Sequence, residues 1–163
     1  MQTQALPAVV LHADVPRKST KRSAKQYACW LLGRREWSAS ELTLKLRAKE
    51  YSEEEISACM VFCQSYGLQS DARFAASRVR MRSRAHGNRR IAQELSRKGI
   101  DLECARAALE VAEDEEIRAI AAAQRFSGKV MTVELRAKAW RFLTTRGFSS
   151  SSIKIALASI AVP

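Results

Sequence analysis

The arginines of residues 78–90 form the densest set of chemically active side chains in this sequence. The stretch reads RVRMRSRAHGNRR, with an arginine at every second position followed by a basic pair. An arginine side chain stays positively charged at any physiological pH and donates hydrogen bonds to anionic oxygens. The chemistry that this stretch predicts is therefore the binding of an anion.

The charge of the whole chain favours the same chemistry. The 163 residues contain 28 Lys and Arg against 17 Asp and Glu, which gives a formal net charge of +11 at pH 7. Such an excess is typical of proteins that bind a nucleic acid, a nucleoprotein or an anionic membrane surface. The charge is also uneven, because residues 73–98 hold nine basic side chains and one acidic one, whereas residues 101–116 hold seven acidic side chains and one basic one.

Residues that could catalyse a reaction are scarce. The sequence contains no Gly-rich phosphate loop, and no nucleophile with a base stands out. Cys59 and Cys63 are one helical turn apart and could form half of a zinc site, but His12 and His86 are the only histidines and do not complete it. We interpret the four cysteines as buried, reduced thiols, and we expect no catalytic residue, no metal and no cofactor.

Two structures are possible for the arginine-rich stretch. Strict alternation is typical of a strand, whose side chains point to opposite faces in turn. A helical projection at about 100° per residue instead separates the apolar from the basic side chains. The apolar side then carries Phe74, Met81 and Ala85, and the opposite side carries Arg73, Arg80 and Arg84. Because the sequence offers no partner strand, it predicts a helix here.

The helix after this stretch begins with basic residues. Gly87 marks the end of the preceding helix, and Asn88 is expected to cap the next one. Arg89 and Arg90 then fall in its first turn, where the positive end of the helix dipole disfavours them. This unfavourable placement suggests that the two arginines face an anion.

Three segments of the chain share one pattern. They are ELTLKLRAKEYSEEEI, RRIAQELSRKGIDLEC and KAWRFLTTRGFSSSSI, and their central leucines, 49 and 48 residues apart, are Leu46, Leu95 and Leu143. A large apolar residue follows each leucine five positions later, at Tyr51, Ile100 and Phe148. Three matches in register predict a repeated structural unit.

Each copy predicts one helix that ends and another that begins. Gly99 and Gly147 stand where a left-handed residue closes a helix, and Ser52 with Glu55 forms a capping box for the next one. The first copy has Glu50 instead of glycine, so its turn should be strained or differently wound.

A further helix precedes each copy. The first is expected at about residues 27–35 and is followed by a capping box of Ser38 and Glu41, the second begins near Asp71, and the third lies in EEIRAIAAAQRF. The sequence thus predicts an all-α fold, an elongated array of three tandem three-helix repeats at residues 26–69, 70–112 and 113–163. Stacking of the repeats is expected to supply the core.

The ends of the sequence add two expectations. Residues 1–25 contain prolines and a basic run and should form a flexible basic arm. No apolar run is long enough to span a bilayer, and the start lacks the positive region of a signal peptide, so we expect a cytoplasmic monomer.

The segments DARFAASRVRMRSRAHGNRRIAQELSRKGID, LLGRREWSASELTLKL and KAWRFLTTRGFS resemble the RecX family of bacterial recombination regulators. The likeness covers residues 27–160, with Gln69-Ser70-Asp71 where the family usually carries an acidic pair. It implies tandem three-helix repeats that bind the RecA filament in its helical groove and limit strand exchange, ATPase and coprotease activity.

Two functions agree with these observations: regulation of a RecA–DNA filament, and plain DNA binding by an arginine-rich helix. The residues expected to contact RecA, DNA or both are Arg73, Arg80, Arg84, Arg89, Arg90, Arg97 and Lys98, with a second patch of Arg136, Lys138, Arg141 and Arg146.

Overall fold

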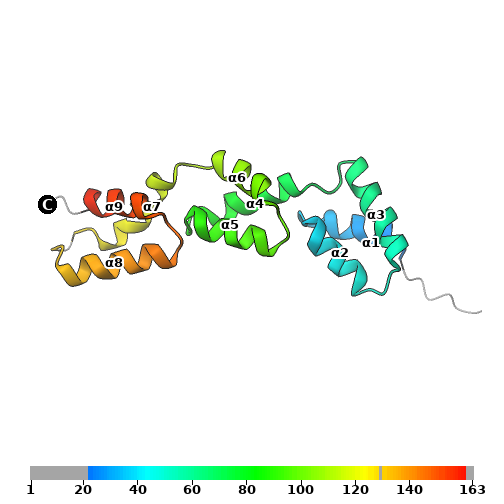
Figure 1. Cartoon of the computed structure of the whole chain (residues 1–163), viewed down its shortest axis with the longest axis horizontal. Helices are drawn as coiled ribbons and strands as arrows, with labels where there is room; N and C mark the ends of the chain where they lie inside the picture. Colours follow the sequence, from blue (N-terminus) through cyan, green and yellow to red (C-terminus); the bar gives the residue numbers. More distant parts are fainter. Residues whose placement is uncertain (1–21, 129, 161–163) are drawn as a thin grey trace, which may run out of the picture.

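The computed structural model describes residues 22–128 and 130–160, and all regular secondary structure in these residues is helical. The helices are α1 (Ala24–Leu32), α2 (Ala39–Arg47), α3 (Glu53–Ser65), α4 (Asp71–Arg82), α5 (Asn88–Arg97), α6 (Leu102–Glu110), α7 (Glu115–Ala123), α8 (Val133–Thr145) and α9 (Ser150–Ser159), with a short 3₁₀ helix η1 (Gln124–Phe126) after α7. The molecule is elongated, with α1–α3, α4–α6 and α7–α9 following one another along its long axis (Figure 1).

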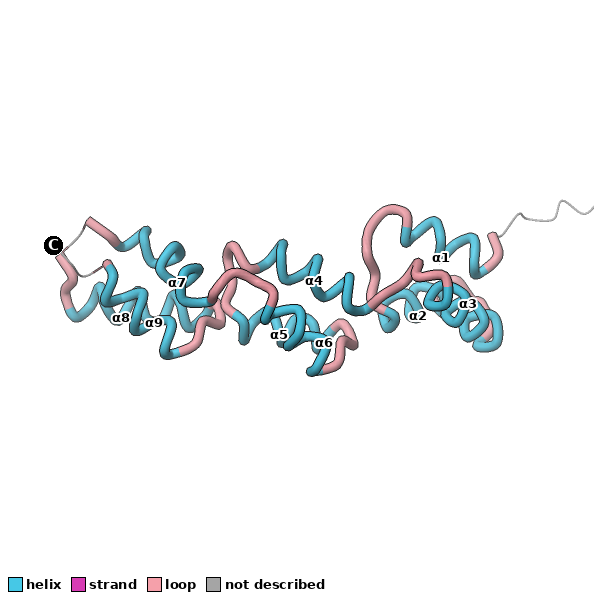
Figure 2. The backbone as a smooth tube through the Cα atoms, turned by 90° about the horizontal axis from the view of Figure 1, so that it is seen from above, coloured by secondary structure: helices cyan, strands magenta, loops and turns pink. Residues whose placement is uncertain are grey.

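Each group of three consecutive helices has its own hydrophobic core. The first is built around Leu42 and Leu46, the second around Ile91 and Leu95, and the third around Leu143 and neighbours from α7 and α9. Figure 2 shows the same three groups from above, with loops between them. The expectation that stacking of repeats supplies the core is therefore wrong: the helices within a group bury their apolar faces against one another.

Most helices begin where local capping residues predict. The Ser52 hydroxyl accepts a hydrogen bond from the Glu55 amide, and the Glu55 side chain accepts one from the Ser52 amide, which confirms the capping box of α3. The Ser38 hydroxyl caps α2 in the same way, but the carboxylate of Glu41 turns to Lys98 instead of back to Ser38.

Helix α1 begins before the residues predicted for it. Ser23 and Gln26 form a reciprocal capping box, so the helix runs over Ala24–Leu32 rather than residues 27–35. Residues 24 and 25, assigned from the sequence to the basic arm, are thus helical. The rest of that predicted arm, up to residue 21, lies outside the described residues.

The arginine-rich stretch is a helix, as predicted, but of its predicted apolar side only Phe74 is buried. The core of α4 contains Phe74, Ala75 and Val79, whereas Met81 is 64% exposed and Ala85 is exposed beyond the helix end. The buried side is rotated because α4 packs against both α5 and α6. Local periodicity alone did not contain that information.

The start of α5 also differs from the prediction. Gly87 is its N-cap, without a side-chain cap, and the Asn88 amide oxygen instead accepts a hydrogen bond from Arg118 at 2.5 Å. The predicted cap failed because a residue from a distant helix occupies the Asn88 side chain. Arg89 and Arg90 lie in the first turn of α5, as expected.

Two joints connect the three groups, and each joins the ends of two helices: α2 to α5 in one joint, and α5 to α8 in the other. At the α2–α5 joint, the Ser38 hydroxyl in front of α2 donates to the Lys98 carbonyl behind α5 at 2.7 Å. At the α5–α8 joint, the Gly87 amide donates to the Arg146 carbonyl at 2.9 Å and the Arg89 amide to the Gly147 carbonyl at 3.2 Å. Each positive helix N-terminus therefore meets a negative helix C-terminus, an arrangement that the helix dipoles favour.

A carboxylate from the following group completes each joint. The Asp71 carboxylate, at the start of α4, accepts from the Ala39 amide at 2.8 Å, and the Glu115 carboxylate, at the start of α7, accepts from the Asn88 amide at 2.6 Å. Both acceptors thus satisfy a free amide at the first residue of the second helix in the preceding group.

The buried side chain of Arg118 stabilises the α5–α8 joint through hydrogen bonds. It is 5% exposed, and its guanidinium donates to the carbonyls of Glu113 at 2.9 Å and His86 at 3.0 Å, besides Asn88. Burial lowers the pKa of Arg118 from its ordinary value, although nearby carboxylates oppose this effect. The residue holds α7 to the turn between α4 and α5.

The cysteines of the described region are free thiols. Cys59 and Cys63 are buried, and burial raises the pKa of Cys63 to about 12, so this thiol stays protonated and unreactive at neutral pH. Cys29 is exposed, contrary to the expectation that all four are buried. In residues 22–128 and 130–160, no group of three or more metal-binding side chains lies together, and none of the helices could span a membrane.

Candidate anion-binding interface

Some of the predicted interface residues form ion pairs within the protein. Arg73 lies 2.9 Å from the Glu36 carboxylate and also donates to the Leu68 carbonyl at 3.0 Å. Lys98 lies 2.5 Å from Glu41 across the α2–α5 joint. Both residues brace neighbouring groups of helices, so they are poorer candidates for binding a partner than the sequence suggested.

The pKa of Glu41 reflects this pairing. Burial alone would raise it, but the hydrogen bond and charge of Lys98, with a smaller contribution from Arg35, hold the pKa of Glu41 below its usual value. The carboxylate is therefore ionised at neutral pH and compensates the charge of Lys98 within the joint.

Other predicted residues keep their charge available. Arg80 and Arg84 on and just after α4 are exposed, and so are Arg136, Lys138 and Arg141 on α8. None of these five makes an ion pair with another described residue. They supply positive charge on the surfaces of two separate groups of helices.

Arg146 differs from these exposed residues. It is half-buried, and its guanidinium lies 3.9 Å from the centre of the Phe142 ring. Such a cation–π contact leaves the positive charge uncompensated. Its carbonyl accepts the Gly87 amide, so the residue lies directly at the α5–α8 joint.

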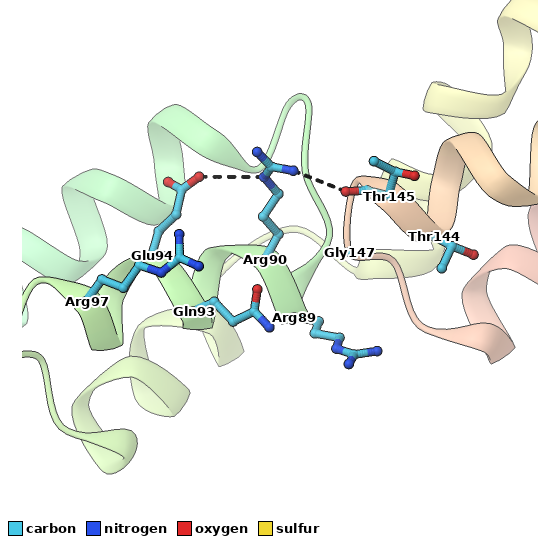
Figure 3. Close-up of a pocket in the computed structure, with 8 residues that line it drawn as sticks. All are labelled: Arg89, Arg90, Gln93, Glu94, Arg97, Thr144, Thr145 and Gly147. Atoms are coloured by element: carbon cyan, nitrogen blue, oxygen red, sulfur yellow. Dashed lines mark hydrogen bonds and ion pairs between the residues drawn. The ribbon is translucent and has the colours of Figure 1, made fainter.

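The α5–α8 joint places three arginines around a pocket. A pocket of about 440 Å³ lies there, lined by Arg89, Arg90, Gln93, Glu94, Arg97, Thr144, Thr145 and Gly147. Figure 3 shows Arg90 reaching from α5 toward the end of α8, where it donates to the Thr145 carbonyl at 3.2 Å. Arg89 and Arg97 form no ion pair with any described residue.

The one carboxylate of this pocket is already compensated. Both oxygens of Glu94 accept hydrogen bonds from Arg82 on α4, at 2.8 and 2.5 Å, and this contact holds the pKa of Glu94 below its usual value. Arg90 lies farther from the same carboxylate, at 3.8 Å. The pocket therefore keeps an excess of positive charge from its three arginines.

Comparison with known proteins agrees with the resemblance seen in the sequence. The family model for the first three-helix domain of RecX matches residues 24–63, and the model for the second matches residues 70–109. The regulatory protein RecX of Chromohalobacter salexigens is 39% identical over 131 residues, which cover 78% of this chain and 86% of that protein. The chain belongs to the RecX family.

Further RecX proteins extend the comparison. The regulatory protein RecX of Vibrio vulnificus is 39% identical over 139 residues, covering 83% of this chain and 91% of that protein. The crystal structure of RecX from Lactobacillus salivarius superimposes with a TM-score of 0.77 at 24% identity, over 84% of this chain and 94% of that one. The second likeness shows that the helical fold is shared.

Sequence reasoning missed the residues that build the joints of this RecX-family chain. Asp71 and Glu115 were assigned only to helix starts, and Arg118 was not considered. Each bonds a residue about 30 positions away in the sequence, 32 for Asp71 and Ala39 and 27 for Glu115 and Asn88. One signal was available: Glu94 is the only acid among nine basic residues, which could have marked it as an internal partner.

Proposed function

We propose that this RecX-family chain is a regulator that binds the RecA–DNA filament in the bacterial cytoplasm and limits its recombinase, ATPase and coprotease activities. Membership of a family of regulatory proteins is the observation that carries the proposal. The protein itself would perform no catalysis, and its action would depend on where it sits on the filament.

The proposed architecture is three tandem three-helix repeats, with boundaries near residues 69–70 and 112–113. The three separate cores support this division. An elongated molecule with polar joints suits a long helical groove, because each repeat can contact a different part of the filament (Figure 1).

The exposed arginines are the proposed contact residues. Arg80 and Arg84 on the central repeat form no ion pair with a described acidic residue, and the pocket at the α5–α8 joint is lined by three arginines and one glutamate. Acidic protein surface and DNA phosphates are both present in a nucleoprotein filament, so either could meet these side chains.

The test is the DNA-dependent ATPase of RecA with increasing amounts of the protein. We expect inhibition at low micromolar protein. We expect the charge-reversing double variant Arg80→Glu, Arg84→Glu to inhibit several-fold less, with the melting temperature kept, since exposed substitutions usually change stability by about 0.5 kcal/mol or less.

A matched control reverses two charges elsewhere. Lys45 and Lys154 are exposed, and the variant Lys45→Glu, Lys154→Glu should inhibit nearly as well as the unmodified protein. Absence of both inhibition and filament binding by the unmodified chain would refute the regulatory function.

The alternative function is a plain DNA-binding helical module, favoured by the density of unpaired arginines. Such a module would bind naked DNA as well as it binds RecA-coated DNA, and its affinity would fall steeply as salt rises. A regulator should instead prefer the filament over the same DNA without RecA.

A further inference from the structure

The α2–α5 and α5–α8 joints have the same arrangement of helix ends but differ in the charged residues at equivalent positions. Each contains a pocket between the start of one second helix and the end of the next. In the repeat alignment, Ser40 and Glu41 of α2 and Ala48 just after it correspond to Arg89, Arg90 and Arg97 of α5. The same three positions therefore carry no net positive charge at one joint and three positive charges at the other.

The α2–α5 joint contains an ion pair that links its two helices. Its pocket of about 300 Å³ is lined by Glu41, whose carboxylate pairs with Lys98 from the opposite helix end at 2.5 Å, and also by Lys45 and Arg97, which form no ion pair with a described residue. This ion pair joins α2 to α5 directly, and an additional anion would have to displace Glu41 to reach Lys98.

The α5–α8 joint has no such pair. Arg90 stands at the position of Glu41, and Arg146 stands at the position of Lys98, so both sides of the joint are basic. Arg90 bonds only a backbone carbonyl across the joint, and Arg146 lies on the Phe142 ring. Glu94 pairs mainly with Arg82, which donates to both of its oxygens, and lies farther from Arg90, at 3.8 Å.

We propose that the pocket at the α5–α8 joint binds a phosphodiester group of a nucleic-acid backbone. The guanidinium groups of Arg89, Arg90 and Arg97 would donate to the phosphate oxygens from α5, and the Thr144 hydroxyl could donate from α8 (Figure 3). The inference rests on the proposed function, since it names the part of the DNA–protein filament that this site would contact.

A phosphate suits this pocket better than a protein carboxylate does. Donors line it from two helices, so they can approach an anion from different sides, whereas a carboxylate presents its oxygens in one plane. Phosphates also recur along a strand, which would bring further ones toward Arg80 and Arg84 on the same group of helices. An acidic protein surface is the competing partner and is separated by the experiment below.

The test measures binding of fluorescently labelled oligonucleotides, single-stranded and duplex, by anisotropy at several salt concentrations. We expect the variant Arg89→Gln, Arg97→Gln to bind at least several-fold more weakly. The slope of log affinity against log salt should fall by about 0.7 for a single strand or about 0.9 for duplex DNA, since one phosphate contact is lost.

A second variant copies the ion pair of the α2–α5 joint. Arg90→Glu would place a carboxylate opposite Arg146, as Glu41 lies opposite Lys98, so it should preserve the joint while blocking the anion site. We expect it to weaken DNA binding at least as much as the double variant, with an unchanged melting temperature. The control Lys25→Gln, Lys154→Gln removes two exposed charges outside both joint pockets and should leave the affinity within about twofold.

The outcomes separate this inference from the regulatory function. Unchanged DNA affinity and salt slope in both pocket variants would overturn the phosphate site, and loss of filament binding in those same variants would assign the pocket to an acidic protein surface. Weaker DNA binding by both variants supports the site even if the unmodified protein does not inhibit RecA. Binding of inorganic phosphate at millimolar concentration by a protein that does not bind DNA would assign the pocket to a free anion and also contradict the inference.

Discussion

At the scale of single residues, the glycines at the joints have two separate reasons to be glycine. Gly147 has a φ of 82°, and a Cβ at this position would lie 2.6 Å from the Cβ of Arg90. Gly67 has a similar φ of 63° but has open space where a Cβ would be. Gly67 and Gly147 thus share the left-handed backbone conformation, but only Gly147 lies close to another helix, at the α5–α8 joint.

We predict that Gly147→Ala destabilises the protein more than Gly67→Ala does. The left-handed conformation costs an alanine about 1–2 kcal/mol at either position, and overpacking against Arg90 adds about 1–3 kcal/mol at position 147. Urea unfolding monitored by circular dichroism measures both values. Equal losses in the two variants would show that the joint has room for a methyl group.

The arginines show how far single residues could be judged from the sequence. Their concentration in residues 73–98 was visible, and the exposure of Arg80, Arg84 and Arg89 agrees with it. The pairing of Arg73 and Lys98 was not visible, because their partners lie 37 and 57 residues away. Which charges remain available is a property of the folded chain, and a charge count cannot supply it.

At the scale of helices, Glu115 connects three helix ends. Its carboxylate accepts from the Asn88 amide at the start of α5, and from the Ser152 hydroxyl at 3.1 Å and the Ser149 amide at the start of α9. One side chain therefore serves both the α5–α8 joint and the packing of α7 on α9.

We predict that Glu115→Gln lowers the free energy of unfolding by about 1.5–3 kcal/mol, the usual range for hydrogen bonds to a charged group. The glutamine side chain would keep one oxygen that can accept a hydrogen bond, but its NH₂ group would face the Asn88 amide or the Ser149 and Ser152 donors and could not accept from them. The neighbouring Glu116→Gln removes the same charge from the same helix start, where no side-chain hydrogen bond of Glu116 is present among the described residues, and it should change stability little. Chemical denaturation of both variants is the measurement, and similar losses would remove the special role of Glu115.

Helix positions were predicted well where the determinants are local. The caps at Ser38 and Ser52 involve residues three positions apart, so the sequence was sufficient to place them. The apolar side of α4 and the cap of α5 were wrong because neighbouring helices decide them. Met81 was expected inside and is exposed, since the space beside α4 is filled through Ala75 and Val79.

At the scale of the whole molecule, three separate cores predict partly independent opening. The cores share no residues, and the contacts between groups are hydrogen bonds and ion pairs rather than a continuous apolar layer. Local opening of one group would therefore expose little apolar surface of another.

We predict that Leu143→Ala, which removes a fully buried side chain, accelerates amide hydrogen exchange in α7–α9 while α1–α3 keeps its protection. Truncation of a buried leucine typically costs about 2–5 kcal/mol, which is enough to open one small core. Hydrogen exchange followed by mass spectrometry resolves the groups. The reciprocal variant Leu42→Ala should affect α1–α3 first, and uniform acceleration across the chain in both variants would show a single cooperative unit.

The order of the helices and the existence of a repeated unit could be predicted from the leucine spacing alone. The pattern could not reveal that each unit closes its own core, because apolar positions look the same whether they face their own helices or a neighbouring unit. The polar joints depend on residues such as Ser38, Asp71 and Glu115, which local patterns assign simply to helix ends.

The turn at Glu50 has a consequence for the order of the units. Its φ of 59° matches the winding of the turns at Gly99 and Gly147, yet it carries a side chain. Gly99 and Gly147 are pressed against the start of an earlier second helix, at Ser40 and Arg90, whereas α2 is the first such helix in the described chain. Residue 50 can therefore carry a side chain only because α1–α3 is the first group in the described chain. In a rearranged chain with α1–α3 placed after another group, the side chain of residue 50 would collide with the start of that group's second helix, and glycine would be needed at this position.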